Sequence, residues 1–275
     1  MATFHLPPAG FGPGSQPEDD ELIYTAMPSG MRTYAPHLPE VDDGATAAPV
    51  LALLARVADA CDACAATGQG ADFDLTGLSP AARRLLAETL GQGEVAMKIR
   101  GAPALAVQES VFAGVWAIAG SGIDRIEVAP APALATRRAH LPHRPALGAQ
   151  AARPAGVVNA PALISELADA SAAWVPGKMA HVVNLTLLPH TPEDLDWLDR
   201  ALGEGATTIL SRGYGNCRVT ATALDHVWKV QFFNSMDSLI LDTFEVTAMP
   251  EVALAAPEDL ADSAARIRQV IEAIR

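Results

Sequence analysis

Apolar and polar residues in the second half of the chain follow a pattern that predicts a strand and then a helix. Residues 180–188 alternate and are rich in β-branched side chains, as in a half-buried strand. Thr191 can serve as an N-cap, Pro192 suits the first helical turn, and Gly203 or Gly205 can end the helix. Its buried face would consist of three leucines at helical spacing, Leu195, Leu198 and Leu202.

Short β-rich segments with brief turns between them predict further strands after this helix, at 207–211, 218–224, 227–233 and 239–246. Consecutive strands joined by such short turns pair antiparallel. A last helix is expected from Pro257 onward. Its apolar face would consist of Leu260, Ala264, Ile267, Val270, Ile271 and Ile274. We expect this helix to cap the sheet that the preceding strands form.

An internal repeat appears when the chain is shifted against itself by 112 residues. Residues 79–116 align with residues 191–228 without a gap, and 10 of the 38 positions are identical. Chance alone would give about 2 to 3 identities. Trp116 then corresponds to Trp228, and amphipathic helices are expected ahead of each copy, at 50–65 and 162–174. We predict that the two tryptophans occupy equivalent core positions.

These elements predict an α+β protein of two tandem related repeats, each a mostly antiparallel sheet with helices on one face. An extended, proline-rich and acidic N-terminal arm is expected over residues 1–46. The first repeat would span residues 47–134 and the second residues 159–275, including the C-terminal helix. A basic linker rich in proline and alanine, residues 135–158, would join them.

The charge of the chain limits its partners. The formal net charge is -13, which repels nucleic acid and anionic lipid headgroups and favours basic partners. The arm alone carries seven acids against Arg32. Acidity that serves only solubility is the alternative explanation.

Export and membrane insertion are not expected from this sequence. The first residues lack the basic and continuous apolar regions of a secretory signal, and no apolar stretch is long enough to span a bilayer. Three cysteines, an odd number, do not form a disulfide framework. We expect a cytoplasmic protein.

The candidate metal and redox residues do not form a recognisable site. Cys61 and Cys64 lie deep in an alanine-rich helix, where buried packing is favoured over redox chemistry, and a metal site would need further ligands besides Cys217. The histidines are scattered without the spacing of metal ligands, namely His140, His143, His181, His190 and His226. No nucleophile motif, phosphate-binding loop or pair of carboxylates stands out, so we expect no cofactor, no metal and no enzymatic activity.

One loop between two predicted strands differs from its counterpart in the first repeat, where only the Arg-Gly pair is kept. Its residues are the candidates for binding a partner: Arg212, Gly213, Tyr214, Gly215, Asn216 and Cys217. Either the glycines serve a hairpin turn and Cys217 begins the next strand, or the loop presents an aromatic ring and a thiol to a partner.

Several strings resemble a known family, the HupH/HyaF hydrogenase expression proteins. They are AHVVNLTLLPHTPEDLDWLDRALGEG, TILSRGYGNCR, VWKVQFFNSMDSLILDTFEV and PEVALAAPEDLADSA. The resemblance runs from about Ala180 to Ile274 and returns more loosely in the arm at 27–40. The internal repeat also fits the duplication of that family, whereas the linker and the first helix match little.

The resemblance implies a cytoplasmic accessory factor for a [NiFe]-hydrogenase. Such a factor acts on the iron–sulfur small-subunit precursor before export, alongside a thioredoxin-like and a rubredoxin-like partner, and no catalytic residue is carried over. Two functions follow as hypotheses. The first is a chaperone-like protein that binds the small-subunit precursor. The alternative is a thiol- or metal-transfer factor that uses Cys217, with or without Cys61 and Cys64.

Overall fold

The computed structural model describes residues 44–213 and 215–274. The predicted arm therefore lies outside the described residues, apart from positions 44–46 at the start of the first helix. The elements of the first half are α1 (Gly44–Thr67), β1 (Ala71–Asp74), α2 (Pro80–Leu90), β2 (Val95–Ile99), β3 (Leu105–Glu109), β4 (Val115–Gly120), β5 (Ile123–Val128) and α3 (Ala133–Arg137).

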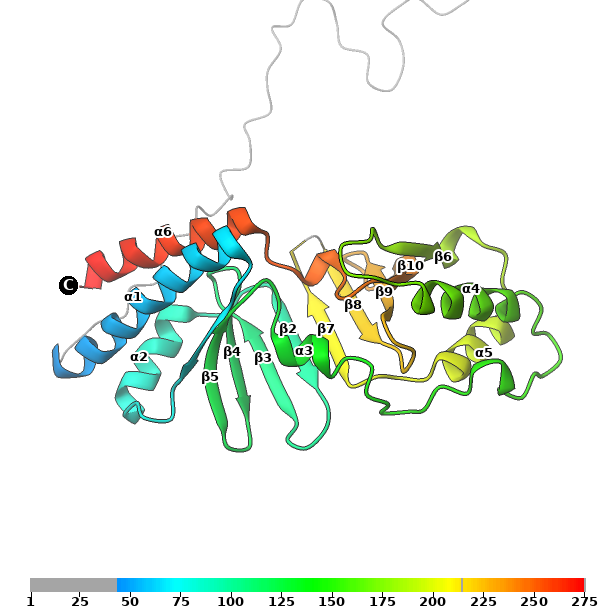
Figure 1. Ribbon diagram of the computed structural model, residues 1–275, viewed down its shortest axis with the longest axis horizontal. Helices are drawn as coiled ribbons and strands as arrows, with labels where there is room; N and C mark the ends of the chain where they lie inside the picture. The colour runs from blue at the N-terminus through cyan, green and yellow to red at the C-terminus, as the bar shows by residue number, and fades with distance from the viewer. Residues whose placement is uncertain (1–43, 214, 275) are drawn as a thin grey trace, which may run out of the picture. The chain divides into compact units, whose positions relative to one another are not determined.

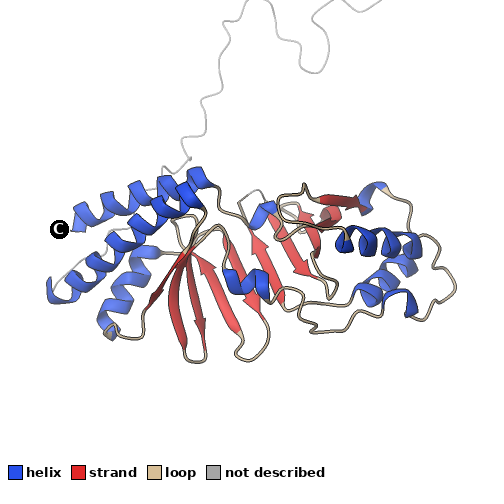
Figure 2. Cartoon of the chain, viewed as in Figure 1, coloured by secondary structure: helices blue, strands red, loops and turns tan. Residues whose placement is uncertain are grey.

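The second half repeats this order of strands and helices (Figure 1, Figure 2). Its elements are η1 (Gly148–Gln150), α4 (Ala160–Ala172), β6 (His181–Asn184), η2 (Leu185–Leu187), α5 (Pro192–Leu202), β7 (Thr207–Ser211), β8 (Asn216–Ala221), β9 (Val227–Phe233), β10 (Leu239–Val246), η3 (Glu251–Ala253) and α6 (Pro257–Ile274). The α+β class and the tandem antiparallel repeats are confirmed.

The strands of the two repeats form one continuous antiparallel sheet rather than two separate sheets. Its order is β1-β5-β4-β3-β2-β7-β8-β9-β10-β6, which reads the same outward from the centre in both directions. Met97 of β2 pairs with Ile209 of β7, and these two positions are separated by the repeat length. A pseudo-two-fold axis therefore passes through this pair. Joining β2 to β7 removes two strand edges that separate sheets would leave unpaired.

The two tryptophans confirm the duplication at atomic detail. Trp116 is the second residue of β4 and Trp228 the second residue of β9, and both are fully buried in the same central cluster. Each indole Nε1 donates to a backbone oxygen that follows the next strand, Ala129 O at 2.8 Å and Thr247 O at 3.1 Å. Their topological equivalence was predicted and is confirmed.

Helices cover the opposite face of the sheet at its two ends. In the first repeat, α1, α2 and α6 share a core with Val115 and Val128; in the second, α4 and α5 share one with Val227 and Val246. Because neighbouring residues of a strand point to opposite faces, these valines lie on the face away from Trp116. Among the described residues, the central strands β2 and β7 contribute no side chain to either of these helix-covered cores.

The C-terminal helix does not cap the second sheet, so that expectation was wrong. α6 packs along α1 of the first repeat, with Leu260 and Ile267 buried beside Val57. Arg268 also forms ion pairs with Asp59 and Asp62 at 2.9 and 2.7 Å. Helical periodicity defines an apolar face but not the surface that the face covers. The helix that ends the second repeat therefore packs in the core of the first repeat.

The segment predicted as a linker packs against the sheet and α5. Ala135 and Ala139 belong to the central cluster, and the backbone oxygen of Ala151 accepts a hydrogen bond from Trp197 Nε1 at 3.1 Å. Arg144 forms an isolated bridge with Glu204. The start of the segment thus contacts both repeats, with Arg138 also donating to Pro103 O at 3.0 Å, and its later residues pack along the second repeat.

Candidate functional site

The candidate loop connects β7 to β8 at the end of the strands. Arg212, Gly213, Gly215 and Asn216 are exposed, and Gly215 has φ +101°, a conformation that favours glycine. Tyr214 lies outside the described residues. The hairpin interpretation accounts for this loop, because β8 begins at Asn216.

The loop does not present the thiol of Cys217. The side chain points into the central cluster and is 3% exposed, because alternation along β8 turns it away from the face of Arg218. Burial, with a further contribution from Glu245, raises the pKa of Cys217 to about 11. A protonated, buried thiol is a poor nucleophile and a poor metal ligand, which removes support from the transfer hypothesis.

The other two cysteines are packed, as predicted. Cys61 and Cys64 are buried between α1 and its neighbours, and burial raises the pKa of Cys61 to about 12. Within the ranges that the structure describes, no group of three or more histidine, cysteine, aspartate or glutamate side chains is placed to hold a metal ion.

The β7–β8 loop lies beside the tip of the β9–β10 hairpin. Asn216 Nδ2 donates to Asp237 Oδ1 at 3.4 Å, and Asn234 Oδ1 accepts from the backbone N–H of Met236 at 2.9 Å. Met236 is 82% exposed at this tip. The two loops therefore form one end of the exposed sheet surface.

A hollow of about 430 Å³ begins at these loops and extends over the strands. Its lining is Leu210, Ser211, Arg212, Asn216, Cys217, Arg218, Phe233 and Asp237. The Arg218 guanidinium lies 5.6 Å from the centre of the Phe233 ring, an arrangement that orients the cation over the aromatic face.

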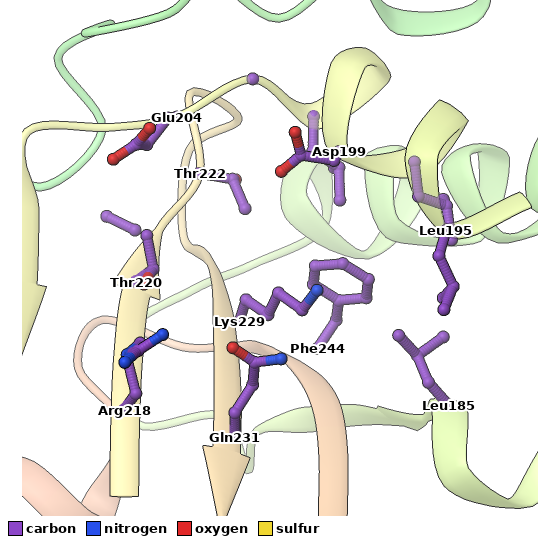
Figure 3. A pocket seen from close by; sticks show the side chains of 14 residues that line it. Leu185, Leu195, Asp199, Glu204, Arg218, Thr220, Thr222, Lys229, Gln231 and Phe244 are labelled. Carbon is purple, nitrogen blue, oxygen red and sulfur yellow. The ribbon is translucent and has the colours of Figure 1, made fainter. Parts of the chain in front are cut away.

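A second hollow of about 220 Å³ adjoins the first and shares Arg218 with it (Figure 3). Thr220, Lys229 and Gln231 rise from the strands on one side, and leucines of η2 and α5 face them from the other. Its lining is Leu185, Leu195, Leu198, Asp199, Leu202, Gly203, Glu204, Arg218, Thr220, Ala221, Thr222, Lys229, Gln231 and Phe244. We call the two hollows together the β8 groove.

Two acids at the edge of the β8 groove are neutralised by arginines from outside it, whereas Asp237 at its loop end is exposed and forms no ion pair with the described residues. Asp199 pairs with Arg144 and Glu204 pairs with Arg100, both at 2.7 Å. Arg218, in contrast, has no carboxylate within ion-pair distance among the described residues. The floor of the groove therefore carries an uncompensated positive charge.

Pseudo-symmetry explains why Arg212 also lacks an acidic partner in the part of the chain that is described. Its counterpart Arg100 pairs with Glu204, and the corresponding neighbour of Arg212 is position 92, which is a glutamine. The Arg212 backbone N–H donates to Glu94 O at 3.1 Å, which confirms that the loop lies beside this segment. A second unpaired cation therefore stands at the loop end of the groove.

The polar floor of the groove is absent from the first repeat. The four residues Arg218, Thr220, Lys229 and Gln231 correspond to Ala106, Gln108, Ala117 and Ala119. Sequence reasoning singled out the loop but missed this floor. The repeat alignment contained the information needed to predict it, because three alanines of the first repeat align with three long polar residues of the second, at positions that point to the same face of the sheet.

The helix that forms the apolar wall is fixed at its N-terminus. Asp194 completes a capping box with Thr191, and its Oδ1 accepts backbone N–H bonds from Val158, Asn159 and Ala160 at 2.8, 3.0 and 3.0 Å. Burial opposes ionisation of this carboxyl, but the donated hydrogen bonds outweigh it and lower the pKa to about 2. The start of α5 is thereby tied to the start of α4.

A sequence model described as "HupH hydrogenase expression protein, C-terminal conserved region" matches this chain in two segments, residues 46–139 and 157–274. The segments correspond to the two halves related by the pseudo-two-fold axis. The two matched segments agree with the tandem repeats of the sheet.

Whole-length relatives give the same result. The chain is 66% identical to hydrogenase expression/formation protein HupH of Rhodobacter capsulatus, over 100% of both chains. It is 43% identical to HoxQ of Cupriavidus necator over 99% and 98% of the chains, and 31% identical to hydrogenase-1 operon protein HyaF of Escherichia coli over 98% and 95%. The solved HupH structure from Thiobacillus denitrificans is 28% identical, with 40% of this chain and 92% of that chain covered and a TM-score of 0.38. The expected resemblance is confirmed, and the chain belongs to the HupH family of hydrogenase expression/formation proteins.

Proposed function

We propose that this protein is an accessory maturation protein that binds the iron–sulfur small-subunit precursor of a membrane-bound uptake [NiFe]-hydrogenase. It acts in the cytoplasm, before export of the precursor, in the manner of a chaperone. The names of the relatives support a role in hydrogenase formation. The observation that carries the proposal is the β8 groove with its flanking loop, an open surface equipped for contact with another protein.

The chemistry of the groove favours binding over catalysis. Its floor offers the hydrogen-bond donors Arg218, Lys229 and Gln231. Two of its acids, Asp199 and Glu204, are held in ion pairs. A general base or an activated nucleophile would need a free carboxylate, histidine or thiolate at hydrogen-bond distance from a reacting group. The buried, protonated thiol of Cys217 does not meet that requirement.

The proposed setting includes further accessory partners, a thioredoxin-like protein and a rubredoxin-like protein, and no nucleic acid. The net charge of -13 supports a protein partner with basic segments over nucleic acid. Within residues 44–213 and 215–274, the helices are too short or too polar to cross a lipid bilayer. We propose that recognition combines the acidic arm with the β7–β8 loop.

A binding titration tests the proposal. Purified small-subunit precursor, with its export signal intact, is titrated against the full chain, a form that lacks residues 1–46, and an Arg212→Ala/Asn216→Ala double variant. The matched control is Arg84→Ala/Gln69→Ala, which removes an exposed arginine and an exposed amide from a part of the first repeat away from the loop.

Each outcome assigns or removes a contact. Loss of binding only in the shortened form assigns recognition to the acidic arm, and the affinity of the full chain should then fall as added salt screens the charges. Loss only in the loop variant places the contact on the second repeat. Failure of the full chain to bind a folded precursor overturns the proposal.

A further inference from the structure

We infer that the β8 groove binds an extended peptide segment in which acidic and apolar side chains alternate. A carboxylate of the segment pairs with Arg218, and an apolar side chain of the segment contacts Leu195, the partly exposed leucine of α5. This inference rests on the proposed function in taking a protein as the partner, but not on which protein that is.

The unpaired arginines specify the charge of the occupant. Arg218 forms no ion pair with an acid among the described residues, and neither does Arg212 at the loop end of the groove. Lys229 lies near Arg218 on the same face as a diagonal neighbour, and such neighbours are about 7 to 8 Å apart. Asp242 holds Lys229 only loosely, with 3.6 Å between Nζ and Oδ2. A carboxylate fits this set of donors, with Arg218 as the main contact.

Apolar side chains that line the β8 groove favour a ligand with apolar groups next to its carboxylate. Leu195 of α5 lines the second hollow and is partly exposed, whereas Leu198 and Phe244 behind it are buried in the core. Leu210 and Phe233 line the first hollow. Leu210 is 45% exposed on its strand, so contact with a ligand would remove apolar surface from water. A fully polar ligand would leave the exposed apolar surface of Leu195, Leu210 and Phe233 in contact with water.

The length of the groove favours a peptide over a small metabolite. The two hollows follow β8 from Asn216 to Thr222, a distance of roughly 20 Å at the rise of a β-strand. An extended segment of about six residues has this length. Because side chains of an extended segment alternate between two sides, alternating acidic and apolar residues would meet the floor and the wall in turn.

The first repeat shows that the fold does not require these cations. Ala106 and Ala117 occupy the positions of Arg218 and Lys229 on an equivalent pair of strands. Charged side chains that are dispensable for the sheet point to a function specific to the second repeat. The same comparison predicts that alanine at both positions leaves the sheet intact.

Two synthetic peptides test the inference directly. Both are acetylated, amidated hexapeptides of alternating residues: one pairs phenylalanine with glutamate, and the other replaces each glutamate by glutamine. Binding to the full chain is measured by isothermal titration calorimetry, and free glutamate serves as the competitor. We expect the glutamate peptide to bind at least tenfold more tightly than the glutamine peptide at low salt, with the difference shrinking as salt rises.

Variants locate the contact. Arg218→Ala/Lys229→Ala should weaken the glutamate peptide at least tenfold, whereas Arg84→Ala, an exposed arginine of the first repeat, should leave its binding unchanged. Circular dichroism and thermal unfolding verify that the double variant is folded.

Any of three results overturns the inference. They are equal binding of the two peptides, unchanged binding in the double variant, and displacement by free glutamate at concentrations similar to the peptide. If the peptides do not bind while the hydrogenase precursor does, the groove inference fails and the proposed function stands. If the glutamate peptide binds in the groove but the precursor does not bind the protein, the proposed function fails and the groove inference stands.

Discussion

Replacement of Asp194 by asparagine tests the contact that fixes α5, the wall of the β8 groove. The carboxylate accepts hydrogen bonds from four backbone N–H groups, three at Oδ1 and that of Thr191 at Oδ2. Asparagine keeps one acceptor oxygen, but its amide nitrogen would face the Thr191 N–H, so that two donors oppose each other. The variant therefore loses the charge and leaves one buried donor without a partner.

The magnitude follows from the ionisation of this group. A pKa lowered from 3.8 to about 2 corresponds to about 2.5 kcal/mol of preference for the charged form in the folded state. A charge-assisted hydrogen bond to a buried donor contributes about 1.5 to 3 kcal/mol, which agrees. We expect Asp194→Asn to lower the free energy of unfolding by about 2 to 3 kcal/mol at pH 7.

The stability that Asp194 contributes should fall as the pH is lowered. Because the pKa of Asp194 is lower in the folded state, its contribution is present above about pH 4 and is lost as the pH falls towards 2. The difference between the two proteins should therefore shrink below pH 4.

Urea unfolding followed by tryptophan fluorescence measures this effect at pH 7 and at pH 3. Asp196→Asn on the exposed side of the same helix is the control and should change stability by less than about 0.5 kcal/mol. A loss below about 0.5 kcal/mol for Asp194→Asn at pH 7 would refute the reasoning, since the hydrogen bonds would then contribute nothing net.

The packing supports three further predictions. Native protein at pH 7 should resist alkylation at all three cysteines and react fully after denaturation; stoichiometric labelling of Cys217 in the native protein, seen by mass spectrometry, would contradict its burial. Trp116→Phe and Trp228→Phe should each lower stability by about 1 to 3 kcal/mol through a lost indole hydrogen bond, and urea unfolding should give values within about 1 kcal/mol of each other if the sites are equivalent. Ile267→Ala should cost about 2 to 5 kcal/mol, with amide exchange accelerated first in α1; acceleration first in α5 would contradict the packing of α6 on the first repeat.

Local sequence determined the secondary structure and the duplication. The cap at Thr191, the leucine stripe of α5 and the glycine at its end each act within a few residues, so they were predicted correctly. The ungapped alignment of the repeats likewise predicted equivalent positions for Trp116 and Trp228, and both side chains lie in the central cluster. The alternation along β8 also implied that Cys217 and Arg218 point to opposite faces, although it did not say which face is buried.

Only the tertiary structure decided how these elements meet. Three sets of contacts join residues that are distant in sequence. They are the pairing of β2 with β7, the packing of α6 on α1, and the ion pairs of Glu204 and Asp199 with Arg100 and Arg144. Because these two acids are already paired, they do not neutralise Arg218. Hydrophobic periodicity determines which face of a helix or strand is apolar. It does not determine which other apolar face of the protein that face packs against. The β8 groove exists because the helices of the two repeats pack at opposite ends of one continuous sheet, and no described helix covers the strands between them on that face.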